Sequence, residues 1–118
     1  MEFNEYYFVF LRRNTGFQFT DDQDQKELGR GHFHFQQKQK LDGTLLVAGP
    51  LDGAGGIYLF KSDDQTKDSL LELLNEDPYV RIGLFSPEVH KWYVPPFFLS
   101  IPETSETTIR EFYSQLIG

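Results

Sequence analysis

The three histidines are the side chains of this chain best suited to move a proton near neutral pH, because a free imidazole has a pKa of about 6.5. They are His32, His34 and His90. The chain contains no cysteine, which excludes disulfides, thiolate metal ligands and a thiol nucleophile. No serine lies in a Gly-x-Ser-x-Gly turn, so that type of serine nucleophile is absent as well. These residue types favour acid–base chemistry over covalent catalysis.

The spacing of two of the histidines leaves two arrangements open. On a helix, His32 and His34 point roughly 200° apart and do not share a site. On a strand they face the same way, and a two-histidine metal site is conceivable, but no third ligand converges with them in the sequence. We therefore expect no metal ion and no cofactor. His90 shares one face of a predicted strand with Trp92, and it is expected at the surface or in an interface.

Four residues near the ends of predicted strands are candidates for substrate binding. Arg12 and Arg13 close the first apolar run, and one of them, Arg12 in our prediction, could hold an anionic substrate by a bidentate contact. The alternative is solvated charge at a strand end. Gly49 and Pro50 end another run and could let a ligand approach the backbone.

Aromatic residues are abundant, with twelve Phe, six Tyr and one Trp. Such side chains bury large areas and are enriched at interfaces, so the excess indicates either a dimer contact or a pocket lining. Tyr58, Tyr79 and Trp92 could line a pocket for an aromatic ligand, and we place Tyr79 among the substrate-binding candidates. Core packing or a dimer contact is the alternative for each of them.

Apolar periodicity predicts the elements that must position these residues. In order, they are a strand over 6–11, a helix over 24–42, strands over 44–48 and 56–61, a helix between 62 and 77, a bent strand over 80–94, and a helix over 107–117. The stretch 32–35 also alternates like a strand, but its wider spacing favours the helix.

Local signals predict where these elements begin and end. Gly43 is expected at the C′ position of the first helix, and Pro50 is expected to stop the second strand. Ser62 and Gln65 fit a capping box at the start of the second helix. Pro78 disfavours helical geometry for the residue before it, so it should close that helix.

The order β-α-β-β-α-β predicts an α+β, ferredoxin-like antiparallel sheet with two helices on one face and an extra C-terminal helix. One domain is expected over 1–118, with residues 95–118 as a C-terminal extension. The opposite face of such a sheet is bare in a monomer, so we expect a homodimer that covers it.

Charge and hydropathy limit the partners of the chain. The formal net charge of −7 argues against nucleic acid and against an anionic membrane surface. No apolar run approaches the roughly 18 residues of a membrane span, and the N-terminus lacks the positive segment of a signal peptide. We therefore expect a cytoplasmic protein whose partner is a small molecule.

Several of these segments together resemble the YciI-like (YCII-related) family over roughly residues 6–94. The resemblance is carried by His32, by Leu-Leu-Val-Ala-Gly-Pro at 45–50, by Gly-Gly-Ile at 55–57, by Asp-Pro-Tyr-Val at 77–80 with Gly83, and by Glu-Val-His-Lys-Trp at 88–92. It implies a dimeric α/β-barrel of ferredoxin-like protomers and an active site built on His32 and Asp77. Most members have no assigned activity. One relative dechlorinates a chlorinated hydroxyhydroquinone, and the wider superfamily includes muconolactone isomerases.

The chain departs from the family pattern in three places. Gln36 and Gln39 stand where the family usually has Leu or Ile, and Lys91 replaces the usual proline before Trp92. The tail after Pro95 has no counterpart in the family pattern. These differences concern the substrate pocket more than the fold.

In a His32–Asp77 pair, the carboxylate would fix the imidazole tautomer and leave the other ring nitrogen to move a proton. The alternative is a structural pair in which Asp77 caps a turn. We predict a small cofactor-independent enzyme with lyase-, isomerase- or dehydrochlorinase-like chemistry on an aromatic or lactone-like substrate. A non-catalytic ligand-binding or protein-interaction domain of the same fold is the alternative.

Overall fold

The structure is a computed structural model that describes residues 2–118. Its elements follow in the order β1 (Asn4–Arg13), α1 (Asp22–Leu41), β2 (Leu45–Leu51), β3 (Gly55–Lys61), α2 (Lys67–Leu74), α3 (Pro78–Arg81), β4 (Phe85–Val94) and α4 (Glu106–Ile117).

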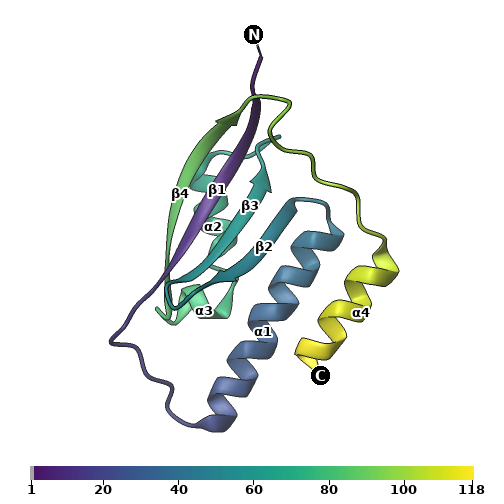
Figure 1. Cartoon of the computed structure of the whole chain (residues 1–118). Coiled ribbons are helices and arrows are strands. Elements are labelled where there is room, and N and C mark those ends of the chain that lie inside the picture. Colours follow the sequence, from purple (N-terminus) through teal and green to yellow (C-terminus); the bar gives the residue numbers. More distant parts are fainter. Residues whose placement is uncertain (1) are drawn as a thin grey trace.

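The described residues form an α+β fold around a four-stranded antiparallel sheet with the order β2-β3-β1-β4 (Figure 1). β1 is central and pairs with β3 on one side and with β4 on the other, so that Val9 stands opposite both Tyr58 and Val89. β2 and β4 are the edge strands. The predicted α+β class, the antiparallel sheet and the hairpin between β2 and β3 are confirmed.

One face of the sheet packs against α1, α2 and α3 and forms the core. Alternate residues of the strands meet apolar side chains of the three helices there, and burial of this apolar surface is the main stabilising force. The cluster comprises Tyr7, Val9, Leu11, Phe35, Leu45, Tyr58, Phe60, Leu70, Leu74, Val80 and Val89. Both main helices therefore lie on one face of the sheet, as predicted.

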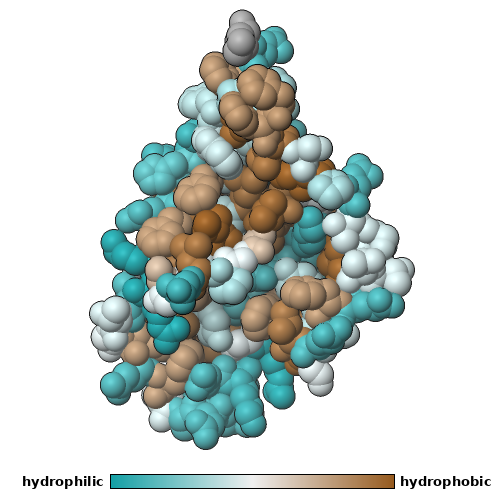
Figure 2. All heavy atoms as spheres, in the orientation of Figure 1, coloured by the Kyte–Doolittle hydropathy of each residue, from teal (hydrophilic) through white to brown (hydrophobic). Residues whose placement is uncertain are grey.

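The opposite face of the sheet carries aromatic side chains that no helix within residues 2–118 covers (Figure 1). Phe8 and Tyr6 of β1 contact Trp92 of β4, with ring centroids 6.1 Å and 6.4 Å apart, respectively. Trp92 is 42% exposed. Figure 2 shows a band of hydrophobic side chains over the sheet in this orientation.

The bent strand predicted over 80–94 is wrong in its first part. Residues Pro78–Arg81 form the short helix α3, and β4 begins only at Phe85. The side chain of Asp77 accepts a hydrogen bond from the backbone N–H of Tyr79, and Pro78 occupies the first turn, where its missing N–H costs nothing. Pro87 lies within β4, which is an edge strand and tolerates it.

Two predicted boundaries are also wrong. The capping box of α2 is formed by Thr66 and Ser69, whose side chains bond each other's backbone N–H, and not by Ser62 and Gln65. Pro50 does not stop β2, which continues to Leu51, because an edge strand has a free side where the missing N–H is not needed.

The first helix is confirmed and starts slightly earlier than predicted. Asp21 caps it by accepting a hydrogen bond from the backbone N–H of Asp24. Its C-terminal end is followed by Gly43 with φ of 79°, the left-handed conformation that favours glycine. The predicted C-terminal helix is confirmed as α4, which lies alongside α1 (Figure 1).

Candidate functional site

His32 of α1 and Asp77, the residue that caps α3, meet in the interior. Nδ1 of His32 lies 2.9 Å from both carboxylate oxygens of Asp77. His32 is 6% exposed and Asp77 is 0% exposed. The expected contact between His32 and Asp77 is therefore present.

Glycines of α1 allow the helix to come close enough to α3 for this contact. A Cβ atom on Gly31 would lie 2.7 Å from Cγ of Pro78, which is closer than real contacts allow. A Cβ on Gly29 would lie 3.1 Å from the hydroxyl of Tyr79. The helix-weakening glycines thus set the distance between the helix that carries His32 and the turn that carries Asp77.

The Asp77 carboxylate receives two further donors. The backbone N–H of Tyr79 donates to Oδ1, and the hydroxyl of Tyr58 donates to Oδ2, both at 3.0 Å. Together with Nδ1 of His32, three donors converge on one buried carboxyl group, which matches a group that only accepts hydrogen bonds. These hydrogen bonds offset the free-energy cost of burying the Asp77 carboxylate.

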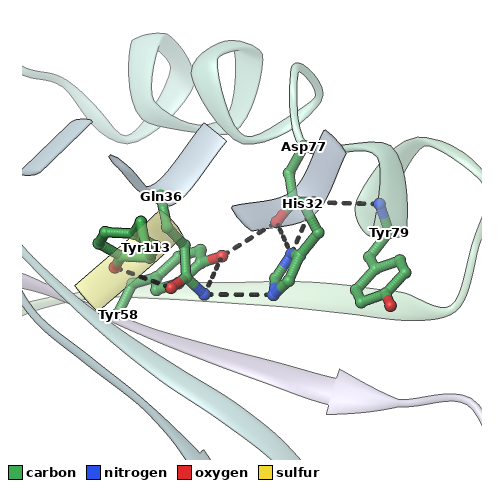
Figure 3. Close-up of polar contacts among 6 residues, drawn as sticks. All are labelled: His32, Gln36, Tyr58, Asp77, Tyr79 and Tyr113. Carbon is green, nitrogen blue, oxygen red and sulfur yellow. Dashed lines mark hydrogen bonds and ion pairs between the residues drawn. The ribbon is translucent and has the colours of Figure 1, made fainter. Parts of the chain in front are cut away.

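The contacts of the two ring nitrogens of His32 limit where its ring proton can lie. A carboxylate can only accept a hydrogen bond, so Nδ1 of His32 carries a proton and donates it to Asp77. Gln36, one turn further along α1, places its amide nitrogen 3.1 Å from Nε2 of His32 and donates to it (Figure 3). With the Gln36 amide in this orientation, Nε2 is the acceptor, an arrangement that corresponds to the Nδ1–H tautomer of a neutral imidazole.

A second chain of hydrogen bonds reaches the site from α4. The hydroxyl of Tyr113 donates to Oε1 of Gln36 at 3.0 Å. The amide nitrogen of Gln36 also donates to the hydroxyl oxygen of Tyr58 at 3.3 Å. The donors run in one direction, from Tyr113 through Gln36 to His32 and Tyr58, and both of these donate to Asp77 (Figure 3).

Burial keeps the tyrosines of this site protonated. Burial first, and then the negative charge of Asp77, raise the pKa of Tyr58 well above 10.0. Burial and Asp77 also raise the pKa of Tyr79, against a smaller opposite effect of the Arg13 cation, and burial raises the pKa of Tyr113. The three phenols therefore stay protonated at neutral pH, and Tyr58 and Tyr113 act as hydrogen-bond donors.

A cavity of about 420 Å³ opens beside His32, which is the size of a small-molecule site. It lies between α1, α4, the β2–β3 hairpin and the end of β1. Its lining comprises Leu11, His32, Phe33, Gln36, Ala48, Gly49, Pro50, Gly55, Gly56, Ile57, Tyr58, Tyr79, Phe85, Phe112, Tyr113 and Leu116. A larger groove of about 710 Å³, lined by residues 101–104 and the end of α1, does not include His32.

Three of the predicted substrate-binding residues line this cavity, namely Gly49, Pro50 and Tyr79. The Tyr79 ring stacks on the His32 ring, with centroids 4.3 Å apart and planes 24° apart. Arg12 is not brought to the site, because it is exposed and pairs with Glu88 at 3.4 Å.

The other histidines do not join the site. His34 is exposed on the far side of α1, as the helical alternative predicts, and His90 is exposed on β4. Within residues 2–118, no three His, Cys, Asp or Glu side chains are grouped so that they could hold a metal ion. No helix of that range has the length and hydropathy needed to span a bilayer.

Sequence reasoning missed the role of two residues. In the sequence, Gln36 stands out only as a polar residue in a position where an apolar one is usual, and Tyr113 lies within the helix predicted over 107–117. A signal for Gln36 exists, because it stands four positions after His32 and so shares its face of the helix. No local signal in the sequence connects Gln36 or His32 to Tyr113.

No protein-family model matches this chain, and a search of the curated proteins returned no significant match. The resemblance to the YciI-like family thus rests on the quoted residues alone.

Proposed function

We propose that this protein is a small cofactor-independent enzyme in which His32 exchanges a proton with an aromatic or lactone-like organic molecule. The observation that carries the proposal is the placement of His32 at the wall of an apolar cavity, with Nδ1 in contact with the buried Asp77 carboxylate and Nε2 beside the Gln36 amide. A neutral imidazole in the Nδ1–H tautomer is prepared to act as a general base.

The chemistry follows from the two ring nitrogens. Nε2 takes a proton from the substrate, and the buried Asp77 carboxylate stabilises the imidazolium that forms. Stacking on Tyr79 holds the ring plane during the transfer. In an isomerisation the same proton returns to another atom of the substrate, and in an elimination the electron pair left behind expels an anionic leaving group.

A second function is favoured by one observation. The Nε2 lone pair already accepts a hydrogen bond from Gln36, so the buried pair is fully satisfied without a substrate. A domain that binds a small ligand in the cavity without transforming it has the same geometry.

A turnover screen with matched variants separates the two functions. The full chain is incubated with a panel of small phenols and lactones, and products are detected by NMR. For any compound that is converted, His32→Ala should lose turnover by at least about a hundredfold, the lower range of general acid–base catalysis. His34→Ala, which changes an exposed residue of the same helix, should retain it. Turnover that survives in a folded His32→Ala variant would overturn the proposal, and binding without conversion would favour the ligand-binding domain.

We further propose that the chain is a YciI-like, ferredoxin-like protomer of a dimeric α/β-barrel. Two observations support this assembly. The strand order β2-β3-β1-β4 is compatible with a ferredoxin-like sheet, and the sheet face opposite the helices carries the aromatic group Tyr6, Phe8 and Trp92. A second copy packed face to face would remove this surface from water.

A further inference from the structure

The walls of the cavity beside His32 are largely apolar, and α4 supplies part of them. Phe112 and Leu116 line the cavity, yet they are 54% and 40% exposed, respectively. Phe33 and Phe85 face the cavity from α1 and β4. A molecule that fills the cavity therefore removes aromatic and aliphatic surface from water on several sides, which favours a largely apolar ligand.

The same cavity contains no formal charge to receive an ion. Among the described residues that line it there is no Lys, Arg, Asp or Glu. Asp77 lies behind His32 and is fully buried. An anionic ligand would find no cationic partner, and it would also be repelled by a chain of net charge −7.

The polar end of the cavity accepts one particular functional group. Nε2 of His32 is an acceptor, and the Gln36 amide beside it is a donor held in place by Tyr113. A ligand hydroxyl that displaces the direct hydrogen bond between Gln36 and His32 would donate its proton to Nε2 and accept the N–H of Gln36, so that two hydrogen bonds replace one. A carbonyl, an ether or a carboxylate there would turn an oxygen lone pair toward Nε2 and leave that nitrogen without a donor, which costs free energy in a buried site.

We propose that this cavity binds an uncharged, largely apolar molecule through a hydroxyl group that inserts between His32 and Gln36, with Gln36 as the residue that selects the hydroxyl. The inference rests on the proposed function, because the hydroxyl stands at the nitrogen that would take the proton. Tyr113 is a positioning residue that orients the Gln36 amide from α4. Residues of the C-terminal extension thereby become part of the binding site.

Three probe molecules of similar size test this selection: phenol, anisole and benzoate. Affinities for the full chain are measured by NMR titration, which reaches weak binding, with the ring signals of His32 as the reporter. One hydrogen bond gained is worth about tenfold in affinity. Phenol should therefore bind at least about tenfold more tightly than anisole, and benzoate should bind more weakly than phenol.

Variants of Gln36 and Tyr113 test whether these residues cause the preference for a hydroxyl group. In Gln36→Met, which keeps the side-chain length, the preference for phenol over anisole should fall to about twofold or less, and Tyr113→Phe should reduce it in the same direction. Gln37→Met is the control, because this neighbour on α1 does not line the cavity, and it should keep the preference. Thermal unfolding of each variant verifies that it is folded.

The outcomes separate this inference from the proposed function. Phenol that fails to bind, benzoate that binds best, or a preference that survives in both Gln36→Met and Tyr113→Phe would overturn the inference. Conversion of a molecule without a hydroxyl, lost in His32→Ala, would overturn the inference and leave the proposed function standing. A Gln36-dependent preference for phenol without conversion of any hydroxyl compound would support the inference against the proposed function.

Discussion

Nδ1 of His32 lies 2.9 Å from both carboxylate oxygens of Asp77, although the two residues are 45 positions apart in the sequence. The contact exists because Gly31 lets α1 approach Pro78, the residue that follows Asp77. α1, the short helix α3 and a buried carboxylate thus hold one imidazole ring in one orientation beside an apolar cavity.

Replacing Asp77 by Asn should destabilise the fold. The carboxylate accepts from His32, Tyr58 and the backbone of Tyr79, whereas an amide of the same shape turns an NH₂ group toward at least one of these donors. An unpaired buried polar group costs about 1–3 kcal/mol, so Asp77→Asn should lower the free energy of unfolding by that amount in urea titrations. Asp63→Asn changes an exposed residue and should leave it within about 0.5 kcal/mol of wild type. Equal stability of the two variants would contradict the role given to the carboxylate.

Alkaline pH should destabilise the protein through Tyr58. Its pKa in the folded state is raised well above 10.0 by burial and by the charge of Asp77, whereas in the unfolded chain it ionises near its ordinary value of about 10. The folded state therefore holds a proton that the unfolded state loses, and its contribution to stability is complete below about pH 10 and declines above it.

Urea unfolding between about pH 8 and pH 11 measures this effect. In Tyr58→Phe the decline above pH 10 should be smaller than in wild type, although the variant is less stable at every pH because Asp77 loses a donor. Tyr93→Phe alters an exposed tyrosine and should follow the wild-type curve. An unchanged slope in Tyr58→Phe would contradict the assignment.

The open sheet face should be the contact between two copies of the chain. Trp92 is 42% exposed there and packs on Tyr6 and Phe8. Sedimentation equilibrium should give a dimer at micromolar concentration, and Trp92→Glu, which places a charge in that contact, should give a monomer. Tyr93→Glu is the control on the neighbouring position, whose side chain points to the other face. A monomeric wild-type protein, or a dimeric Trp92→Glu, would argue against this face as the interface.

Most of the fold could be predicted from the sequence because the elements of this chain carry strong local signals. The strand over 6–11 is a run of aromatic, β-branched and aliphatic residues, and Gly43 marks where the helix over 24–42 ends, although residues 32–35 also alternate like a strand. The region after Pro78 was predicted wrongly, because a single helical turn is too short to differ from strand-like alternation. The capping box was misplaced by one turn, because Ser62 and Gln65 fit the usual Ser-x-x-Gln pattern, whereas the observed box pairs Thr66 with Ser69.

The candidate site was predictable only in part. Asp77 was paired with His32 through a family resemblance, because no local pattern connects residues 45 positions apart. Gln36 and Tyr113 could not be paired at all, since the contact spans 77 positions and depends on how α4 packs on α1. Arg12 was assigned to the site from its place at a strand end, and the structure turns it to Glu88 instead.

The central claim is that His32 acts as a general base, and measuring the tautomer of its ring tests this most directly. The proposed chemistry needs an unprotonated Nε2 and a proton on Nδ1. Nitrogen NMR of the imidazole side chains, at a pH at which the ring is neutral, distinguishes the two nitrogens without any substrate. The structure predicts that Nδ1 of His32 carries the proton and that Nε2 has the signal of a hydrogen-bonded acceptor, shifted in Gln36→Met. A proton on Nε2 of the neutral ring would contradict the account, because that nitrogen could then not act as the base.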